Sequence, residues 1–99
     1  MGLALQREEV LEKLQQSKPY LQERFGVATI GLFGSFSRGE QTENSDVDLI
    51  VTFDKPIGLD FITLKDYLES LFQRKVDLVT MRALKPQLKD QILKDVIFQ

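Results

Sequence analysis

The 99-residue sequence predicts an α/β domain in which a small sheet of about three or four strands is flanked by about four or five helices. Three short segments, 27–33, 46–53 and 75–80, have the composition of strands, and segments with helical spacing of apolar residues lie before, between and after them. Because 42% of the residues are hydrophobic and the chain is short, it can fill one core. We therefore expect a single domain over residues 1–99.

The chain before the first strand is expected to form two helices. Its apolar residues recur at roughly helical spacing among charged and amide side chains: Leu5, Val10, Leu11 and Leu14. The run from Ser17 to Pro19 is expected to end the first helix, with Ser17 as the N-cap of a second short helix, Pro19 in its first turn and Gly26 at its end. Helices bury one apolar stripe, so we expect both to cover the sheet.

Residues 29–53 carry the pattern with the most chemical meaning. A strand is followed by Gly34-Ser35, then by ten residues, and then by Asp46-Val47-Asp48 at the start of the second strand. Because side chains alternate across a strand, Asp46 and Asp48 share one face. Two adjacent carboxylates repel each other and destabilise a fold unless a cation lies between them. Their oxygens favour Mg²⁺, which proteins commonly hold with one or two carboxylates and the phosphates of a substrate.

The turn at Gly34 and Ser35 predicts the other half of a phosphate site, at the start of a short helix that ends near Gly39. A helix opening at Ser35 would direct free backbone N–H groups at an anion, and Gly34 would let that backbone come close. Ser35 could also be an ordinary N-cap, but the aspartate pair at this distance favours the phosphate site. Arg38 is either a surface residue in an ion pair or a charge partner for a triphosphate.

After the second strand, Asp54–Gly58 is expected to form a turn and Asp60 to cap the next helix. That helix has an apolar stripe at helical spacing: Ile57, Phe61, Leu64, Leu68 and Leu71. The third strand, 75–80, then places Asp77 on one face beside Val79. A carboxylate in an apolar strand is costly if it is merely buried, so Asp77 either contributes to a metal site or pairs with a nearby cation: Arg74, Lys75 or Arg82.

The C-terminal segment predicts one more helix, which begins at Pro86. Its stripe consists of Leu88, Ile92 and Val96. Further apolar residues fall partly outside that stripe, among them Leu93, Ile97 and Phe98. They indicate either a surface for a partner protein or a docked terminus.

Composition excludes several classes of protein. A formal net charge of −2 and a pI near 5.1 argue against a basic surface that binds nucleic acid. Without cysteine there is no disulfide or thiolate site, and without histidine a general base must be a carboxylate, lysine, tyrosine or the substrate itself. The start MGLALQREEV is a poor signal peptide, and no run is long enough for a membrane span, so we expect a cytoplasmic protein.

Taken together, these residues resemble the nucleotidyltransferases of the DNA polymerase beta type, whose signature is Gly-Ser, a loop of about this length and then Asp-x-Asp. The resemblance covers nearly the whole chain. Within that superfamily, the short length, the segment GSFSRGE and the later RKVDLVT look like the minimal nucleotidyltransferases (MNT, MntA-like) of prokaryotes. The resemblance implies a mixed sheet and a HEPN-domain partner in a toxin–antitoxin pair.

The resemblance also implies a reaction, the transfer of AMP from ATP to a hydroxyl with release of pyrophosphate, assisted by two Mg²⁺ ions. The catalytic and metal-binding residues would be Asp46, Asp48 and Asp77. The phosphates would be held by Gly34, Ser35 and Arg38. Asp77 could also accept the proton of the attacking hydroxyl.

Three functions remain open at this point. The first is AMP transfer to a tyrosine of a HEPN toxin, which would make the protein an antitoxin. The second is transfer to a small-molecule hydroxyl, as in aminoglycoside nucleotidyltransferases, which resemble the chain only in this core and carry a further domain. The third is a binding module that inhibits its partner by contact alone, and the intact aspartates weigh against it.

Overall fold

The computed structural model describes residues 5–99, and the start of the chain, Met1–Ala4, lies outside the described residues. Four strands form one sheet in the order β3-β2-β1-β4. Their bounds are β1 (Val27–Phe33), β2 (Val47–Phe53), β3 (Val76–Thr80) and β4 (Ile97–Phe98). β2 and β3 are parallel, whereas β1 is antiparallel to both β2 and β4. The predicted mixed sheet is therefore confirmed.

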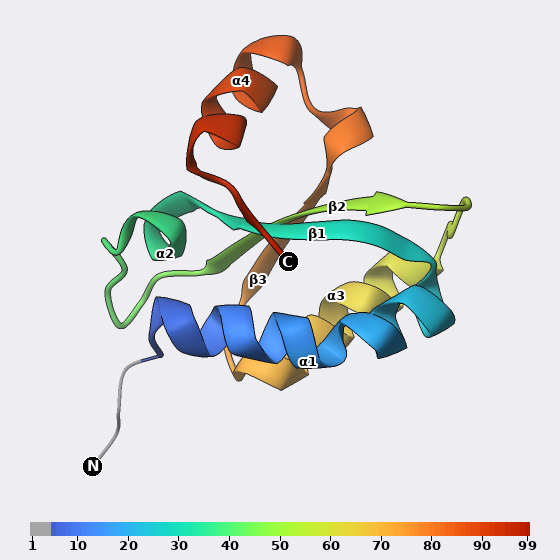
Figure 1. The fold of residues 1–99 in the computed structure, drawn as a ribbon, viewed down its shortest axis with the longest axis horizontal. Coiled ribbons are helices and arrows are strands. Elements are labelled where there is room, and N and C mark those ends of the chain that lie inside the picture. Colours follow the sequence, from blue (N-terminus) through green and yellow to red (C-terminus); the bar gives the residue numbers. More distant parts are fainter. Residues whose placement is uncertain (1–4) are drawn as a thin grey trace.

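Helices cover both faces of this sheet (Figure 1). α1 (Arg7–Phe25) and α3 (Asp60–Phe72) lie on one face, and α4 (Pro86–Asp95) lies on the other, after the short 3₁₀ helix η1 (Met81–Ala83). α2 (Gly34–Arg38) follows directly from the end of β1. The main core lies between the sheet and the α1–α3 layer. Within residues 5–99, no helix is long and apolar enough to cross a membrane.

α1 runs without interruption through Pro19, so the predicted break at Ser17–Pro19 is wrong. Its buried residues form one continuous stripe against the sheet: Val10, Leu14, Ser17, Leu21 and Phe25. A proline inside an isolated helix removes one backbone hydrogen bond and costs roughly 3 kcal/mol. The free energy gained by packing this stripe against the sheet outweighs that cost. Ser17 is therefore a buried residue within the helix, where its hydroxyl lies 3.4 Å from that of Tyr67, and not an N-cap. Gly26 ends the helix in the left-handed conformation, as predicted.

α3 buries Leu64 and Leu68 of the expected stripe, together with Phe72, which the stripe did not include; Phe61 and Leu71 are only partly buried, and Ile57 lies before the helix. The prediction that Asp60 caps this helix is wrong, because Leu59 occupies the N-cap position and no side chain caps the helix. Asp60 lies instead in the first turn, where its carboxylate pairs with Arg24 at 3.6 Å. The pair joins the start of α3 to the end of α1.

The two-residue strand β4 was not predicted, and it settles where the C-terminus lies. Ile97 and Phe98 pair with β1, and the amide of Gln99 donates to the carbonyl of Ile30 at 2.9 Å. Gly31 makes this possible, since a Cβ there would lie 2.5 Å from Val96 Cγ2. The docked terminus is thus the correct interpretation for the backbone, although Phe98 remains 45% exposed.

Candidate active site

The turn after β1 lies directly against one of the predicted carboxylates. Phe33 pairs with Asp48 across the β1–β2 ladder, and Gly34 follows with φ +75°. A Cβ on Gly34 would lie 2.1 Å from Asp48 Oδ2. Only glycine fits this position, because any other side chain would collide with the carboxylate and would also strain the backbone. The Gly-Ser turn and Asp48, separate in sequence, therefore lie against each other.

The parallel register of β2 and β3 places Asp48 beside Asp77. The pKa of Asp48 is raised to about 6, chiefly by burial and then by the negative charges of Asp77 and Asp46, whereas Arg38 acts in the opposite direction. Asp77, Asp46 and Arg38 therefore all act on the charge of Asp48, and negative charge predominates among these four groups. Asp46 itself lies one residue before β2, because the strand begins at Val47.

Asp77 is an exposed residue between two buried neighbours of β3. Within the described chain it forms no ion pair with Arg74, Lys75 or Arg82, so the alternative of a simple charge pair is wrong. A carboxylate that faces solvent beside Asp48 is free to contact a ligand.

The donor set fits Mg²⁺. Three carboxylates supply hard oxygen ligands, and a cation bound beside Asp48 would offset the neighbouring negative charges that help to raise its pKa. Among residues 5–99, no three acidic side chains are already close enough to form a complete metal site. Mg²⁺ rarely uses such a cage and relies on substrate phosphates for part of its coordination.

Ser35 lies in the first turn of α2, which begins at Gly34. The alternative that Ser35 caps the helix is wrong, because Phe33 occupies the N-cap position and no side chain accepts a bond there. The backbone carbonyl of Ser35 accepts from the amide of Glu40 at 2.8 Å, an interaction that leaves the hydroxyl uninvolved. The hydroxyl is thus available to a phosphate at the turn beside Asp48.

Arg38 forms ion pairs at 2.8 Å with Glu40 through Nε and with Asp95 through Nη1. The neighbouring hydroxyl of Ser37 donates to the carbonyl of Asp95. The interpretation as an ion-paired surface residue therefore describes the structure, and a phosphate contact by Arg38 stays a prediction. Asp95, which ties the end of α4 to α2, was not recognised in the sequence because no local pattern relates two residues so far apart.

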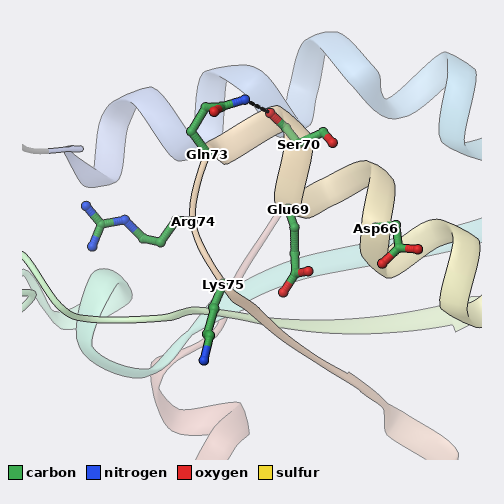
Figure 2. Close-up of a pocket in the computed structure, with 6 residues that line it drawn as sticks. All are labelled: Asp66, Glu69, Ser70, Gln73, Arg74 and Lys75. Carbon is green, nitrogen blue, oxygen red and sulfur yellow. Dashed lines mark hydrogen bonds between the residues drawn. The ribbon is translucent and has the colours of Figure 1, made fainter.

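Arg74 was also missed as a site residue, since sequence reasoning considered it only as a partner for Asp77. Its guanidinium donates to backbone carbonyls of the loop before Asp46. Figure 2 shows this side chain extending away from Glu69 and Asp66, with which it lines a shallow depression of about 490 Å³. A second cavity, of about 540 Å³, lies where β2 and β3 end. Neither cavity is lined by the candidate carboxylates.

Comparisons with known proteins agree with this geometry. The family model described as a nucleotidyltransferase domain matches residues 14–98. The protein adenylyltransferase MntA of Thermococcus cleftensis is 46% identical over 92 residues, which cover 92% of this chain and 93% of that protein. A solved structure of a candidate minimal nucleotidyltransferase is 37% identical with a TM-score of 0.80, covering 97% of this chain and 98% of the other. A crystal structure of a toxin–antitoxin complex with AMP-PNP is 27% identical with a TM-score of 0.68, covering 95% of this chain and 72% of the other.

Proposed function

This chain belongs to the nucleotidyltransferase domain family, and we propose that it transfers AMP from ATP to a tyrosine hydroxyl of a HEPN-type toxin, as the antitoxin of the pair. The observation that carries the proposal is the contact between the Gly34 turn and the carboxylate of Asp48, with Asp77 in register on the next strand. This arrangement brings phosphate donors and metal-binding oxygens to one point, which nucleotide transfer requires.

The nucleotide is bound by the turn between β1 and α2. The backbone of Gly34 can approach a phosphate closely because it has no side chain, and the hydroxyl of Ser35 adds a donor. Arg38 can exchange its exposed partner Glu40 for a phosphate oxygen at little cost, since exposed ion pairs contribute little free energy. The related toxin–antitoxin complex that contains AMP-PNP supports ATP as the donor.

Asp46, Asp48 and Asp77 would hold two Mg²⁺ ions. When bound, these ions neutralise the charge on the phosphates and on the attacking oxygen. The chain's own contribution is to bring acidic side chains to neighbouring positions despite their repulsion. The rigid pairing of β2 with β3 does this for Asp48 and Asp77.

In the transfer step, the acceptor's hydroxyl oxygen forms a bond to the α-phosphorus of ATP. The bond from the α-phosphorus to the oxygen that bridges it to the β-phosphorus breaks, and pyrophosphate leaves. Asp77 accepts the hydroxyl proton. Its exposure on β3 leaves room for an acceptor to approach from the solvent side.

A protein is the acceptor that the chain fits best. The acidic balance does not favour RNA or DNA. The similarity to a protein adenylyltransferase and to a toxin–antitoxin complex supports a toxin partner, and the MNT resemblance supports the HEPN type. Leu93 and Phe98, which are 38% and 45% exposed, offer one apolar contact for it.

The test is to purify the protein together with its partner and to incubate the complex with ATP and Mg²⁺. Intact-mass spectrometry of the partner should show added AMP units on a tyrosine, and Asp77→Asn should abolish them. Asp90→Asn, which changes an exposed carboxylate on α4 in the same way, is the matched control and should transfer AMP normally. An unmodified partner, together with a small molecule that becomes adenylylated, would refute the proposal.

A further inference from the structure

Arg74 forms an unusual set of contacts at the start of β3. Its Nη1 lies 2.8 Å from the carbonyl oxygen of Glu43, 2.9 Å from that of Ser45 and 3.4 Å from that of Thr42. Its Cζ lies 5.6 Å from the ring centroid of Phe36, a fully buried residue of α2. One side chain therefore contacts the loop before β2 and the helix of the phosphate turn at once.

The loop that Arg74 holds ends at Asp46. Ser45, whose carbonyl accepts one of the shortest bonds, immediately precedes that aspartate in sequence. The loop's own bonds, such as Thr42 N to Ser45 Oγ at 2.8 Å, shape it locally but do not attach it to the sheet. Hydrogen bonds from a charged guanidinium are stronger than neutral ones. Among these hydrogen bonds of the loop, those from Arg74 therefore contribute most to holding the loop against the sheet.

The other end of the connection leads to Asp77. Arg74 directly precedes Lys75, whose carbonyl accepts from the amide of Val47 at 3.0 Å, and β3 then carries Asp77 three residues after Arg74. The two chain segments that bear the carboxylates thus enter the sheet side by side, joined by the side chain of Arg74 and by this backbone bond. Figure 2 shows Arg74 at this junction, directed toward the segment that leads into β2.

We infer that Arg74 is a positioning residue for nucleotide transfer: it holds the loop 42–45 against β3 and so fixes Asp46 relative to Asp48 and Asp77 for metal binding. The inference rests on the function proposed above, because it concerns the same three carboxylates. Like charges drive Asp46 away from the other two, and a mobile loop would let it move. Groups that orient metal ligands commonly affect metal affinity about 10- to 100-fold.

The experiment compares Arg74→Met with Arg24→Met. Arg24 is a matched control, because it also lies over a phenylalanine, at 4.7 Å from the ring centroid of Phe25, and its Nη1 also has a polar partner, an ion pair with Asp60 at 3.6 Å. Methionine keeps the apolar stem in both cases and removes the charge and the donors. Two quantities are measured on the full chain: amide hydrogen exchange over residues 42–46, and binding of Mn²⁺ in the presence of AMP-PNP, followed by electron paramagnetic resonance.

Arg74→Met should accelerate exchange in the loop and raise the Kd for Mn²⁺ about tenfold or more, whereas Arg24→Met should leave both within about twofold of wild type. Arg74→Lys keeps a charged donor on a shorter side chain and should recover part of the affinity, which a general loss of stability would not explain. In transfer assays, the required Mg²⁺ concentration should rise more than the KM for ATP.

Equal effects of the two methionine variants, or an unchanged Mn²⁺ affinity in Arg74→Met, would overturn the inference. If Arg74→Met does not fold, Arg74→Lys decides alone: a wild-type affinity for Mn²⁺ in that variant, together with loop exchange as slow as in wild type, would overturn the inference. A wild-type protein that binds Mn²⁺ and AMP-PNP but transfers no AMP would refute the proposed function while leaving this inference standing. A wild-type protein that binds no Mn²⁺ would overturn both.

Discussion

Replacing Asp48 by asparagine should stabilise the metal-free protein at neutral pH while abolishing transfer. The pKa of Asp48 rises from 3.8 to about 6 on folding, first through burial and then through the charges of Asp77 and Asp46. A carboxyl with a raised pKa is harder to ionise in the folded state than in the unfolded chain. Its ionisation therefore lowers the free energy of unfolding.

The pH range follows from these two values. Below about pH 4 the carboxyl of Asp48 is protonated in both states and does not lower the free energy of unfolding. Between about pH 4 and 6 the unfolded chain releases a proton that the folded protein keeps, so stability falls as the pH rises. Above the pKa of the folded state, the carboxyl is ionised in both states, and the loss of stability no longer changes with pH.

The magnitude is moderate. A shift of about two units corresponds to roughly 3 kcal/mol as an upper bound, at 1.36 kcal/mol per unit. Asp48 is only partly buried, so solvent screening reduces the effect to roughly 1–2 kcal/mol. For a domain of this size, each 1 kcal/mol moves the Tm by about 4–8 °C.

The assay is thermal unfolding of wild type and Asp48→Asn between pH 4 and 8, in EDTA and without nucleotide. The variant should melt at the same temperature as wild type near pH 4 and on the order of 5–10 °C higher at pH 8. Asp90→Asn, the exposed control on α4, should show no such pH-dependent gain. A variant no more stable than wild type at pH 8, or a difference that is the same at pH 4 and 8, would show that the pKa of Asp48 is not raised in the folded protein.

Three further outcomes test the site. Ser35→Ala should lower the rate of AMP transfer at least about tenfold while changing the Tm by little, because the hydroxyl does not cap α2; an early melt with full activity would contradict this assignment. Gly34→Ala should lose activity and at least about 1–3 kcal/mol of stability, measured by urea unfolding, since the new Cβ collides with Asp48 Oδ2 at a position with φ +75°; wild-type stability would mean that the turn does not lie against the carboxylate. Asp95→Asn should lower the KM for ATP by freeing Arg38 from an ion pair, whereas an unchanged KM would remove Arg38 from the phosphate site.

The sequence by itself determined the chemical pattern of the site. Gly34, Ser35, Asp46 and Asp48 are defined by their spacing along one strand–turn–strand segment, and such spacing is a local property. The placement of Asp77 on the face opposite Val76 and Leu78 also followed from local alternation, and these two neighbours are buried in the structure. The bounds of β1 are those predicted, because an apolar run that ends at a glycine turn defines both the strand and the residue at which it stops.

Only the tertiary structure decided the features that depend on partners distant in sequence. α1 continues through Pro19 because packing against the sheet outweighs a local signal for a break. β4 has two residues, too few for any periodicity, and exists because Gly31 leaves room for the terminus to pair with β1. The burial of Asp48, its position beside Asp77 and the contacts of Arg74 involve groups that are tens of residues away along the chain. Sequence spacing cannot report such contacts, since they are set by the register of β2 on β3 and by how the loop folds against it.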